Sequence, residues 1–101
     1  MFRLINQEKV DVMPQVTVKY LMVFSQVTGK KEEKLAIDEN ATIEDLLKIL
    51  YNRYGRKFKK HIEQDFENRS VLFVVNGESK DASTKLKDKD EVLISYPVGG
   101  G

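Results

Sequence analysis

Cysteine is missing from the 101-residue sequence, and histidine occurs only once, at His61. Without cysteine the chain has no disulfide framework, no thiolate metal site and no cysteine nucleophile. A single histidine cannot build a histidine-based metal cluster within one chain. His61 is expected at the surface of a charged segment, so no serine has a plausible catalytic base. We therefore expect no metal site and no internal active site, so that the chain is not an enzyme on its own.

A charge excess of one sign and a long apolar run are also missing. Seventeen basic against sixteen acidic residues leave a formal net charge of +1, which is too small for a nucleic-acid binder recognised by its overall field. No segment approaches the roughly 20 apolar residues that span a bilayer, and no phosphate-binding glycine pattern occurs. The basic run Arg56–His61 is typical of a solvated helix face. We expect a cytoplasmic chain without membrane contact, direct nucleic-acid binding or a bound cofactor.

Hydrophobic alternation near the start of the chain predicts a β-hairpin. Apolar and polar residues alternate from Val16 to Phe24, which predicts a strand of about nine residues with Met22 on the same side as Val16. A glycine-bearing turn, Ser25–Lys31, follows, and residues 34–38 then alternate again. The two alternating segments are expected to pair as a hairpin.

Two helices are predicted in the middle of the chain. Thr42 is a candidate N-cap, and Asp45, three residues later, completes a capping box. Gly55 stands where a left-handed C-cap is expected. The apolar stripe between these residues has helical spacing and consists of Ile43, Leu46, Leu47, Leu50 and Tyr54. A second, shorter helix is predicted from three apolar residues spaced four apart, Phe58, Ile62 and Phe66.

Three further segments complete the predicted sheet. The apolar run Val71–Val75 predicts an internal strand that ends in a tight turn at Asn76-Gly77. Ser83–Lys87 is read as a short edge element, and Val92–Tyr96 as the last strand. The helix stripe is expected to pack on inward-facing strand residues, namely Val18, Tyr20, Phe73 and Ile94. This order of elements predicts an α+β fold, a β-grasp (ubiquitin-like) roll with a mixed sheet and a helix packed on one face.

The predicted domain spans residues 16–98, between an N-terminal extension and a glycine tail. Residues 1–15 are only weakly periodic and are read as a flexible or loosely docked extension. Pro97 ends strand pairing because it has no N–H, and residues 99–101 are three glycines. Extended, the segment from Pro97 to Gly101 reaches about 16 Å, enough to thread a narrow channel that side chains would obstruct. Its free α-carboxylate is ionised at neutral pH and must be activated before it reacts as an electrophile.

Several short motifs follow one another in a recognisable order along residues 16–101. They are Val16-Thr-Val-Lys-Tyr20, Thr28-Gly29-Lys30, Ala41-Thr-Ile-Glu-Asp-Leu-Leu47, Val75-Asn-Gly77, Leu86-Lys-Asp-Lys-Asp-Glu-Val92 and Tyr96-Pro-Val-Gly-Gly-Gly101. With the terminal diglycine, this set resembles the MoaD/ThiS group of ubiquitin-like sulfur carrier proteins, and most closely its MoaD branch. Tyr96 stands where the family's Pro-Pro-Val-x-Gly-Gly ending has its first proline, and residues 1–15 precede the usual first strand.

The resemblance implies that the chemistry takes place at Gly101. An E1-like adenylating enzyme would use ATP to adenylate its carboxylate, and a sulfur donor protein would supply the sulfur of a thiocarboxylate. The carrier would then act as the small subunit of molybdopterin synthase in molybdenum cofactor biosynthesis, with the catalytic residues on the large subunit. Pro97, Val98, Gly99 and Gly100 would thread the tail into the partner.

The sheet face that the helix does not cover is a second candidate site. Apolar residues expected on this face would form a partner-docking patch of Leu21, Val23, Leu72, Val74 and Leu93. The alternative is that the second helix or the N-terminal extension covers them.

Two other functions stay open at this point. The same tail chemistry would serve sulfur supply for tRNA thiolation, or conjugation to protein lysines as a ubiquitin-like modifier. From a different class, the chain would be a plain β-grasp interaction domain with an idle tail. Deleting Gly100 and Gly101 separates these readings, because a pure binder should keep its partner affinity.

Overall fold

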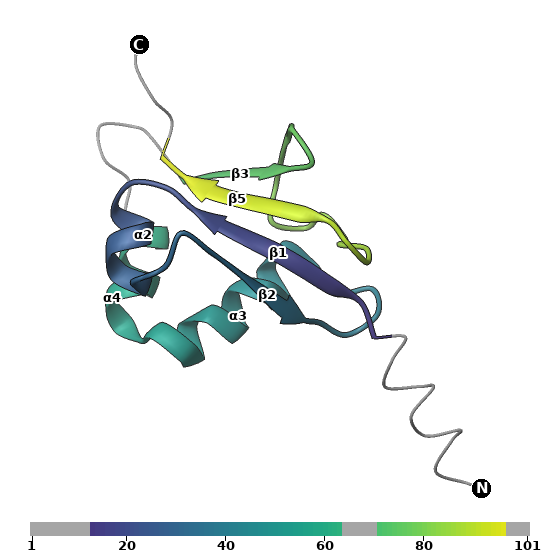
Figure 1. The fold of residues 1–101 in the computed structure, drawn as a ribbon, viewed down its shortest axis with the longest axis horizontal. Coiled ribbons are helices and arrows are strands. Elements are labelled where there is room, and N and C mark those ends of the chain that lie inside the picture. The colour runs from purple at the N-terminus through teal and green to yellow at the C-terminus, as the bar shows by residue number, and fades with distance from the viewer. Residues whose placement is uncertain (1–12, 64–70, 97–101) are drawn as a thin grey trace, which may run out of the picture.

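One five-stranded mixed sheet organises the fold, in the strand order β2-β1-β5-β3-β4 (Figure 1). The computed structural model describes residues 13–63 and 71–96. The strands are β1 Gln15–Tyr20, β2 Glu32–Ala36, β3 Leu72–Val75, β4 Glu78–Lys80 and β5 Glu91–Ser95. The helices are α2 Val23–Thr28, α3 Ile43–Tyr54 and α4 Arg56–Glu63. Strands β1 and β5 run parallel and the other neighbouring pairs are antiparallel, which confirms the predicted α+β fold with a mixed sheet.

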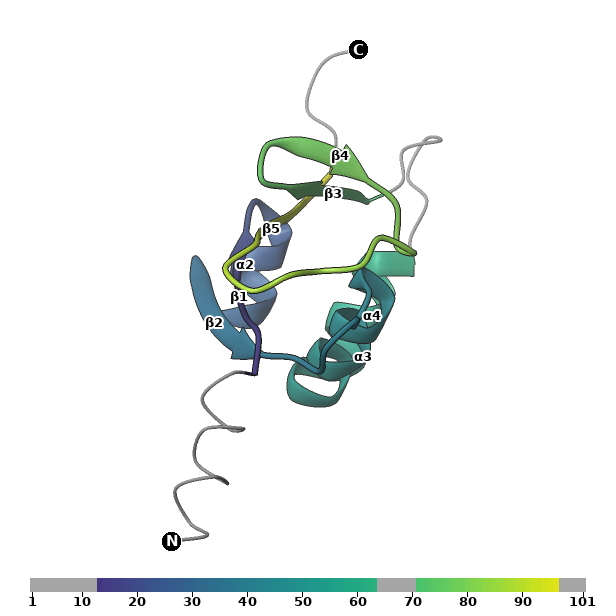
Figure 2. The same cartoon turned by 90° about the vertical axis from the view of Figure 1, so that its right-hand side faces the viewer.

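Helices α3 and α4 lie together on one side of the sheet (Figure 2). Side chains alternate across a strand, so each strand turns every second residue toward the helices. In β1 these residues are Val16, Val18 and Tyr20, each at most 1% exposed. The predicted core is confirmed, because all its members are buried: Ile43, Leu46, Leu47, Leu50, Val18, Tyr20, Phe73 and Ile94.

The predicted capping box at the start of α3 is confirmed. The Asp45 amide donates to the Thr42 hydroxyl at 3.2 Å, and the Thr42 amide donates to the Asp45 carboxylate at 3.0 Å. The other end differs from prediction: Gly55 has a positive φ of 82°, but its ψ of −161° is extended and not left-handed helical. The reason is that α4 starts at the next residue, and the Gly55 carbonyl already accepts the Lys59 amide of that helix.

The first strand is shorter than its alternation predicts. β1 ends at Tyr20, and α2 replaces both the expected end of the strand and the expected glycine turn. A short apolar run fits helical and strand periods equally well, so its spacing cannot separate the two. Met22 has a positive φ of 58° between the two elements, and the left-handed Gly29 ends α2. β1 and β2 still pair antiparallel, but through this helix and not through a tight hairpin.

The hairpin after β3 forms as predicted, but the edge element lies elsewhere. β3 is internal, between β5 and β4. Asn76 and Gly77 have φ values of 51° and 88°, as two-residue hairpin turns require. Such a turn brings the next residues straight back beside β3, so the edge strand is β4. The predicted edge element Ser83–Lys87 was wrong; within it, Lys85 forms an isolated bridge to Thr42.

Pro14 and Gln15, the last residues of the predicted extension, are joined to the sheet. β1 starts at Gln15, and the Ile37 amide donates to the carbonyl of the buried Pro14 at 2.9 Å. The predictions made for residues 1–12, 64–70 and 97–101 lie outside the described residues. Within the described part of the chain, no helix is long and apolar enough to cross a membrane.

Candidate functional site

The predicted reactive tail follows β5, the middle strand of the sheet. β5 lies between β1 and β3 and ends on the same side of the molecule as α2 and α4 (Figure 1). The structure therefore describes the base of the tail, which consists of Ser95 and Tyr96. The tail residues themselves lie outside the described ranges: Pro97, Val98, Gly99, Gly100 and Gly101.

Both hydrogen-bonded ladders of β5 stop just before the tail. Ile94 is the last residue of β5 that pairs with β1, and Ser95 is the last that pairs with β3, opposite Leu72. Ser95 is 3% exposed and Tyr96 is 9% exposed. The tail therefore starts from a buried position at the centre of one end of the sheet.

The side chain of Tyr96 contacts two helices. Its hydroxyl donates a hydrogen bond of 2.6 Å to the backbone carbonyl of His61 in α4. Its ring lies 5.2 Å, centroid to centroid, from the ring of Phe24 in α2. The Ser95 hydroxyl lies 3.0 Å from the Tyr96 carbonyl and donates to it. Burial raises the pKa of Tyr96, so the phenol remains protonated and a donor at neutral pH.

The open face of the sheet carries three of the five predicted docking residues. Leu72, Val74 and Leu93 are half-buried, while their strand neighbours Phe73 and Ile94 are buried on the helix side. Val74 and Leu93 stand directly opposite each other on β3 and β5. They line a shallow hollow of about 260 Å³ together with polar residues of the neighbouring strand and turn. The structure thus brings these three apolar side chains together on one face.

The other two predicted docking residues, Leu21 and Val23, differ in their exposure to solvent. Leu21, which directly follows β1, is 44% exposed. Val23 opens α2 and packs against the core, so its expected place on the open sheet face was wrong because the strand ends before it. Met22, which the alternation had placed on the core side, is 54% exposed. Its sulfur lies 3.7 Å from the Ser95 hydroxyl, so Met22 is an exposed apolar residue beside the tail base that the sequence pattern missed.

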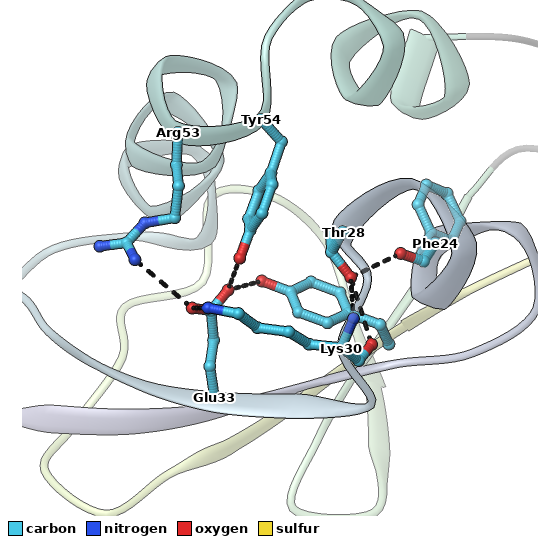
Figure 3. A network of polar contacts seen from close by, with 7 residues as sticks. Phe24, Thr28, Lys30, Glu33, Arg53 and Tyr54 are labelled. Atoms are coloured by element: carbon cyan, nitrogen blue, oxygen red, sulfur yellow. Dashed lines mark hydrogen bonds and ion pairs between the residues drawn. The ribbon is translucent and has the colours of Figure 1, made fainter.

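A carboxylate largely withdrawn from solvent forms the main polar network (Figure 3). The side chain of Glu33 in β2 is 8% exposed and accepts hydrogen bonds from Tyr20 at 2.6 Å and Tyr54 at 2.5 Å. Lys30 and Arg53 lie 3.1 and 3.6 Å from its other oxygen. Burial raises the pKa of Glu33, but the hydrogen bonds from both tyrosines and Lys30 outweigh it and lower the pKa overall. This network joins β2 to the segment after α2 and to α3, and it contains none of the predicted tail or docking residues.

Helix α4 separates its charged face from its buried face. Its four cations are exposed, as expected of a solvated face: Arg56, Lys57, Lys59 and Lys60. His61 is half-buried and so less exposed than the cations of the helix; its ring lies edge-on to Phe24 at 6.3 Å. Its Nδ1 is buried without a hydrogen-bond partner in the described part of the chain.

Among residues 13–63 and 71–96, no group of three or more His, Cys, Asp or Glu side chains is placed to hold a metal ion.

Comparison with known proteins shows the family to which the chain belongs. The model of the ThiS family matches residues 18–101. Small archaeal modifier protein 3 from Haloferax volcanii is 28% identical over 91 residues, which cover 86% of this chain and 99% of that protein.

Two solved structures resemble the chain over most of its length. One is a candidate molybdopterin converting factor, subunit 1, from Pyrococcus furiosus, with 32% identity, a TM-score of 0.70, and coverage of 84% of this chain and 99% of that chain. The other is small archaeal modifier protein 1 from Methanosarcina acetivorans, with 28% identity, a TM-score of 0.68, and coverage of 88% and 98%. Because the family match runs from β1 through the final glycine, the chain belongs to the ThiS family of ubiquitin-like sulfur carriers and modifiers.

Proposed function

We propose that the chain is a sulfur carrier whose C-terminal Gly101 becomes a thiocarboxylate. In this proposal it is the non-catalytic small subunit of molybdopterin synthase and donates sulfur to a molybdopterin precursor. The catalytic residues belong to the large subunit, and the chain itself binds no cofactor. The reaction takes place in the cytoplasm.

The proposed chemistry starts from an unreactive carboxylate. An α-carboxylate is ionised at neutral pH and resists attack by nucleophiles. A carboxylate oxygen of Gly101 therefore first attacks the α-phosphate of ATP on an E1-like enzyme, which forms an acyl adenylate and releases pyrophosphate. Sulfide-level sulfur, delivered as HS⁻ by a donor protein, then attacks the acyl carbon, and AMP leaves as the C–S bond forms. The resulting thiocarboxylate gives up its sulfur inside the synthase.

The observation that carries the proposal is the extent of the family match. It runs from residue 18 to Gly101, so it includes both the described domain and the three terminal glycines. Glycine has no side chain to block a narrow channel, which suits a tail that must enter two different partner sites. The 32% identity to the candidate molybdopterin converting factor subunit supports the choice of acceptor.

The open sheet face supports docking to those partners. Leu72, Val74 and Leu93 lie on the face opposite the helices, and Leu21 and Met22 extend the apolar surface toward the tail base. Apolar surface gathered in one place often marks an interaction site. In this proposal the face binds the activating enzyme and the large subunit in turn, each with the tail in its own pocket.

A second candidate function is supported by the modifier proteins among the relatives. The 28% identity to small archaeal modifier protein 3 covers 99% of that protein. The adenylated carboxyl of Gly101 would then be joined to a lysine of another protein with release of AMP. Alternatively, the thiocarboxylate formed from it would give its sulfur to a tRNA. The two functions share the activation step and differ in the acceptor.

Intact-mass spectrometry of the chain recovered from its native cells tests the proposal. A thiocarboxylate makes the chain heavier by the difference between one sulfur and one oxygen atom. The expected result is a population with this added mass that disappears when Gly101 is deleted. The same samples are searched for proteins joined to the chain through Gly101.

Each outcome of this experiment favours one function. The added mass without conjugates supports the sulfur carrier, and conjugates through Gly101 support the modifier. Only the unmodified mass, even after incubation with an E1-like enzyme, ATP and a sulfur donor, would overturn both. The chain would then be better described as a plain interaction domain.

A further inference from the structure

The chain leaves its hydrogen-bonded sheet at one defined point. The ladder to β1 ends at Ile94 and the ladder to β3 ends at Ser95. The next residue, Tyr96, lies beyond both ladders and is nevertheless 9% exposed. Two contacts of its side chain help to hold the chain at this point.

These contacts come from two helices that are remote in sequence. The Tyr96 ring packs on Phe24 of α2 at 5.2 Å, and its hydroxyl reaches the His61 carbonyl of α4 at 2.6 Å. The phenol thus ties the start of the tail to α4, while the ring ties it to α2. The Phe24 and His61 rings also contact each other at 6.3 Å, so the tail base rests on a continuous buried cluster.

We propose that Tyr96 is a positioning residue, which fixes the point from which Gly101 is presented to the activating enzyme. This inference rests on the proposed function. Five residues follow Tyr96, so the reach of the carboxylate from this anchor is at most about 16–18 Å. Removing the Tyr96 hydroxyl loses one hydrogen bond, whose net free energy corresponds to about a 2- to 13-fold fall in the share of anchored conformations.

The contacts that hold Tyr96 and the proposed docking face lie on opposite sides of the sheet. The apolar open face lies on the other side of the sheet from the helices, and the Tyr96 contacts are made with α2 and α4. Loss of the anchor should therefore leave the affinity for a partner unchanged and lower the rate of the step at the tail. A residue that only stabilises the fold would not produce this pattern.

The test compares Tyr96→Phe with Tyr51→Phe. The first variant keeps the ring against Phe24 and removes only the hydroxyl that binds His61. The second removes the hydroxyl of another half-buried tyrosine, which packs on Phe58 in the interior of the helix layer. Both proteins are assayed with an E1-like adenylating enzyme by exchange of labelled pyrophosphate into ATP, and their urea unfolding is measured in parallel.

The expected result is a kcat for Tyr96→Phe about three- to tenfold below that of the wild type, with KM within twofold. Tyr51→Phe should match the wild type in both constants. An unchanged kcat of Tyr96→Phe beside an active wild type would overturn the positioning role alone. A matching loss in Tyr51→Phe, or a rise in KM without a change in kcat, would also overturn it. Absence of exchange with the wild type would overturn the proposed function, and the positioning role with it.

Discussion

Glu33 shows how neighbours decide the charge of a single residue. Two phenols donate to one of its carboxylate oxygens, and Lys30 and Arg53 lie beside the other. Burial and Glu33 together raise the pKa of Tyr20, so this phenol stays protonated while the carboxylate stays charged. Hydrogen bonds to a charged group contribute about 1.5–3 kcal/mol each. The network should therefore stabilise the junction between β2 and the helices most strongly when Glu33 is ionised.

Replacing Glu33 by glutamine should destabilise the protein by about 1–3 kcal/mol at neutral pH, because the side chain keeps its size but loses its charge. The pKa of Glu33 is lowered in the folded state, so its contribution is fully present above the ordinary glutamate pKa and is lost as the pH falls through the lowered value. The difference between wild type and variant, measured by urea unfolding, should therefore shrink below about pH 4. Glu39→Gln, at an exposed position, is the control and should change stability by less than about 0.5 kcal/mol. An equal loss at low and neutral pH would contradict this account.

Residue-scale features were the hardest to predict from the sequence. The two phenols that bind Glu33 lie 13 and 21 positions away along the chain, and no short spacing connects them. The His61 carbonyl that binds Tyr96 is 35 positions away. Such contacts depend on how helices and strands pack, so a sequence pattern gives the residue types but not the pairs. The Thr42 capping box was predicted because its partners lie only three residues apart.

That capping box determines how helix α3 begins. The Thr42 hydroxyl accepts the Asp45 amide, one of the donors that the first helical turn leaves without a partner. The interaction with Thr42 lowers the pKa of Asp45, which keeps the carboxylate negative near the positive end of the helix. The start of the element that carries the core stripe is thus fixed by two short side chains.

Thr42→Ala should destabilise the protein by about 0.5–2 kcal/mol, as is typical for the loss of an N-cap. Thr42→Ser keeps the hydroxyl and should recover most of the loss. Both values come from urea unfolding monitored by circular dichroism. If serine were as destabilising as alanine, the methyl group and not the cap would be the important feature.

The turn between β3 and β4 depends in the same way on one residue. Gly77 has a φ of 88°, and a Cβ at this position would meet open space. Gly77→Ala should therefore destabilise the protein through its backbone conformation and not through a clash with neighbouring atoms. The expected loss of unfolding free energy is about 1–2 kcal/mol. Asn tolerates positive φ better than other residues with a side chain, so Gly77→Asn should be less destabilising. Thermal unfolding of the two variants separates backbone strain from a general effect of adding a side chain.

Helices and strands marked by two independent sequence features were predicted well, and the helix marked by only one feature was not. Helix α3 has both a cap and a long apolar stripe, and β3 has both an apolar run and an Asn-Gly turn. Helix α2 has only six residues, and its apolar spacing also continues the alternation of β1. The sequence therefore predicted the right pairing of β1 with β2 but the wrong connection between them. For the same reason Val23 was expected on the sheet face and Met22 on the core side.

At the scale of the whole molecule, stability and the proposed chemistry belong to different parts of the chain. The core lies between the sheet and helices α3 and α4, and its buried cluster ends at Tyr96. The proposed reaction takes place at the last atom of the chain, five residues later. Tyr96 is the residue at which the two parts meet, since it is buried in the core cluster and directly precedes the tail.

This separation leads to opposite expectations for two changes. Leu50→Ala removes a fully buried side chain and should cost about 2–5 kcal/mol, which lowers the Tm by about 10 °C or more in a domain of this size. Chain ends are usually outside the core, so we expect deletion of Gly101 to leave the Tm within about 2 °C of the wild-type value. The rate of pyrophosphate exchange, measured below the Tm of each variant, should show the opposite pattern. It should be nearly normal for Leu50→Ala and absent for the Gly101 deletion. A large fall in Tm on deleting Gly101 would mean that the tail is part of the folded core, and the division between carrier domain and reactive tail would have to be abandoned.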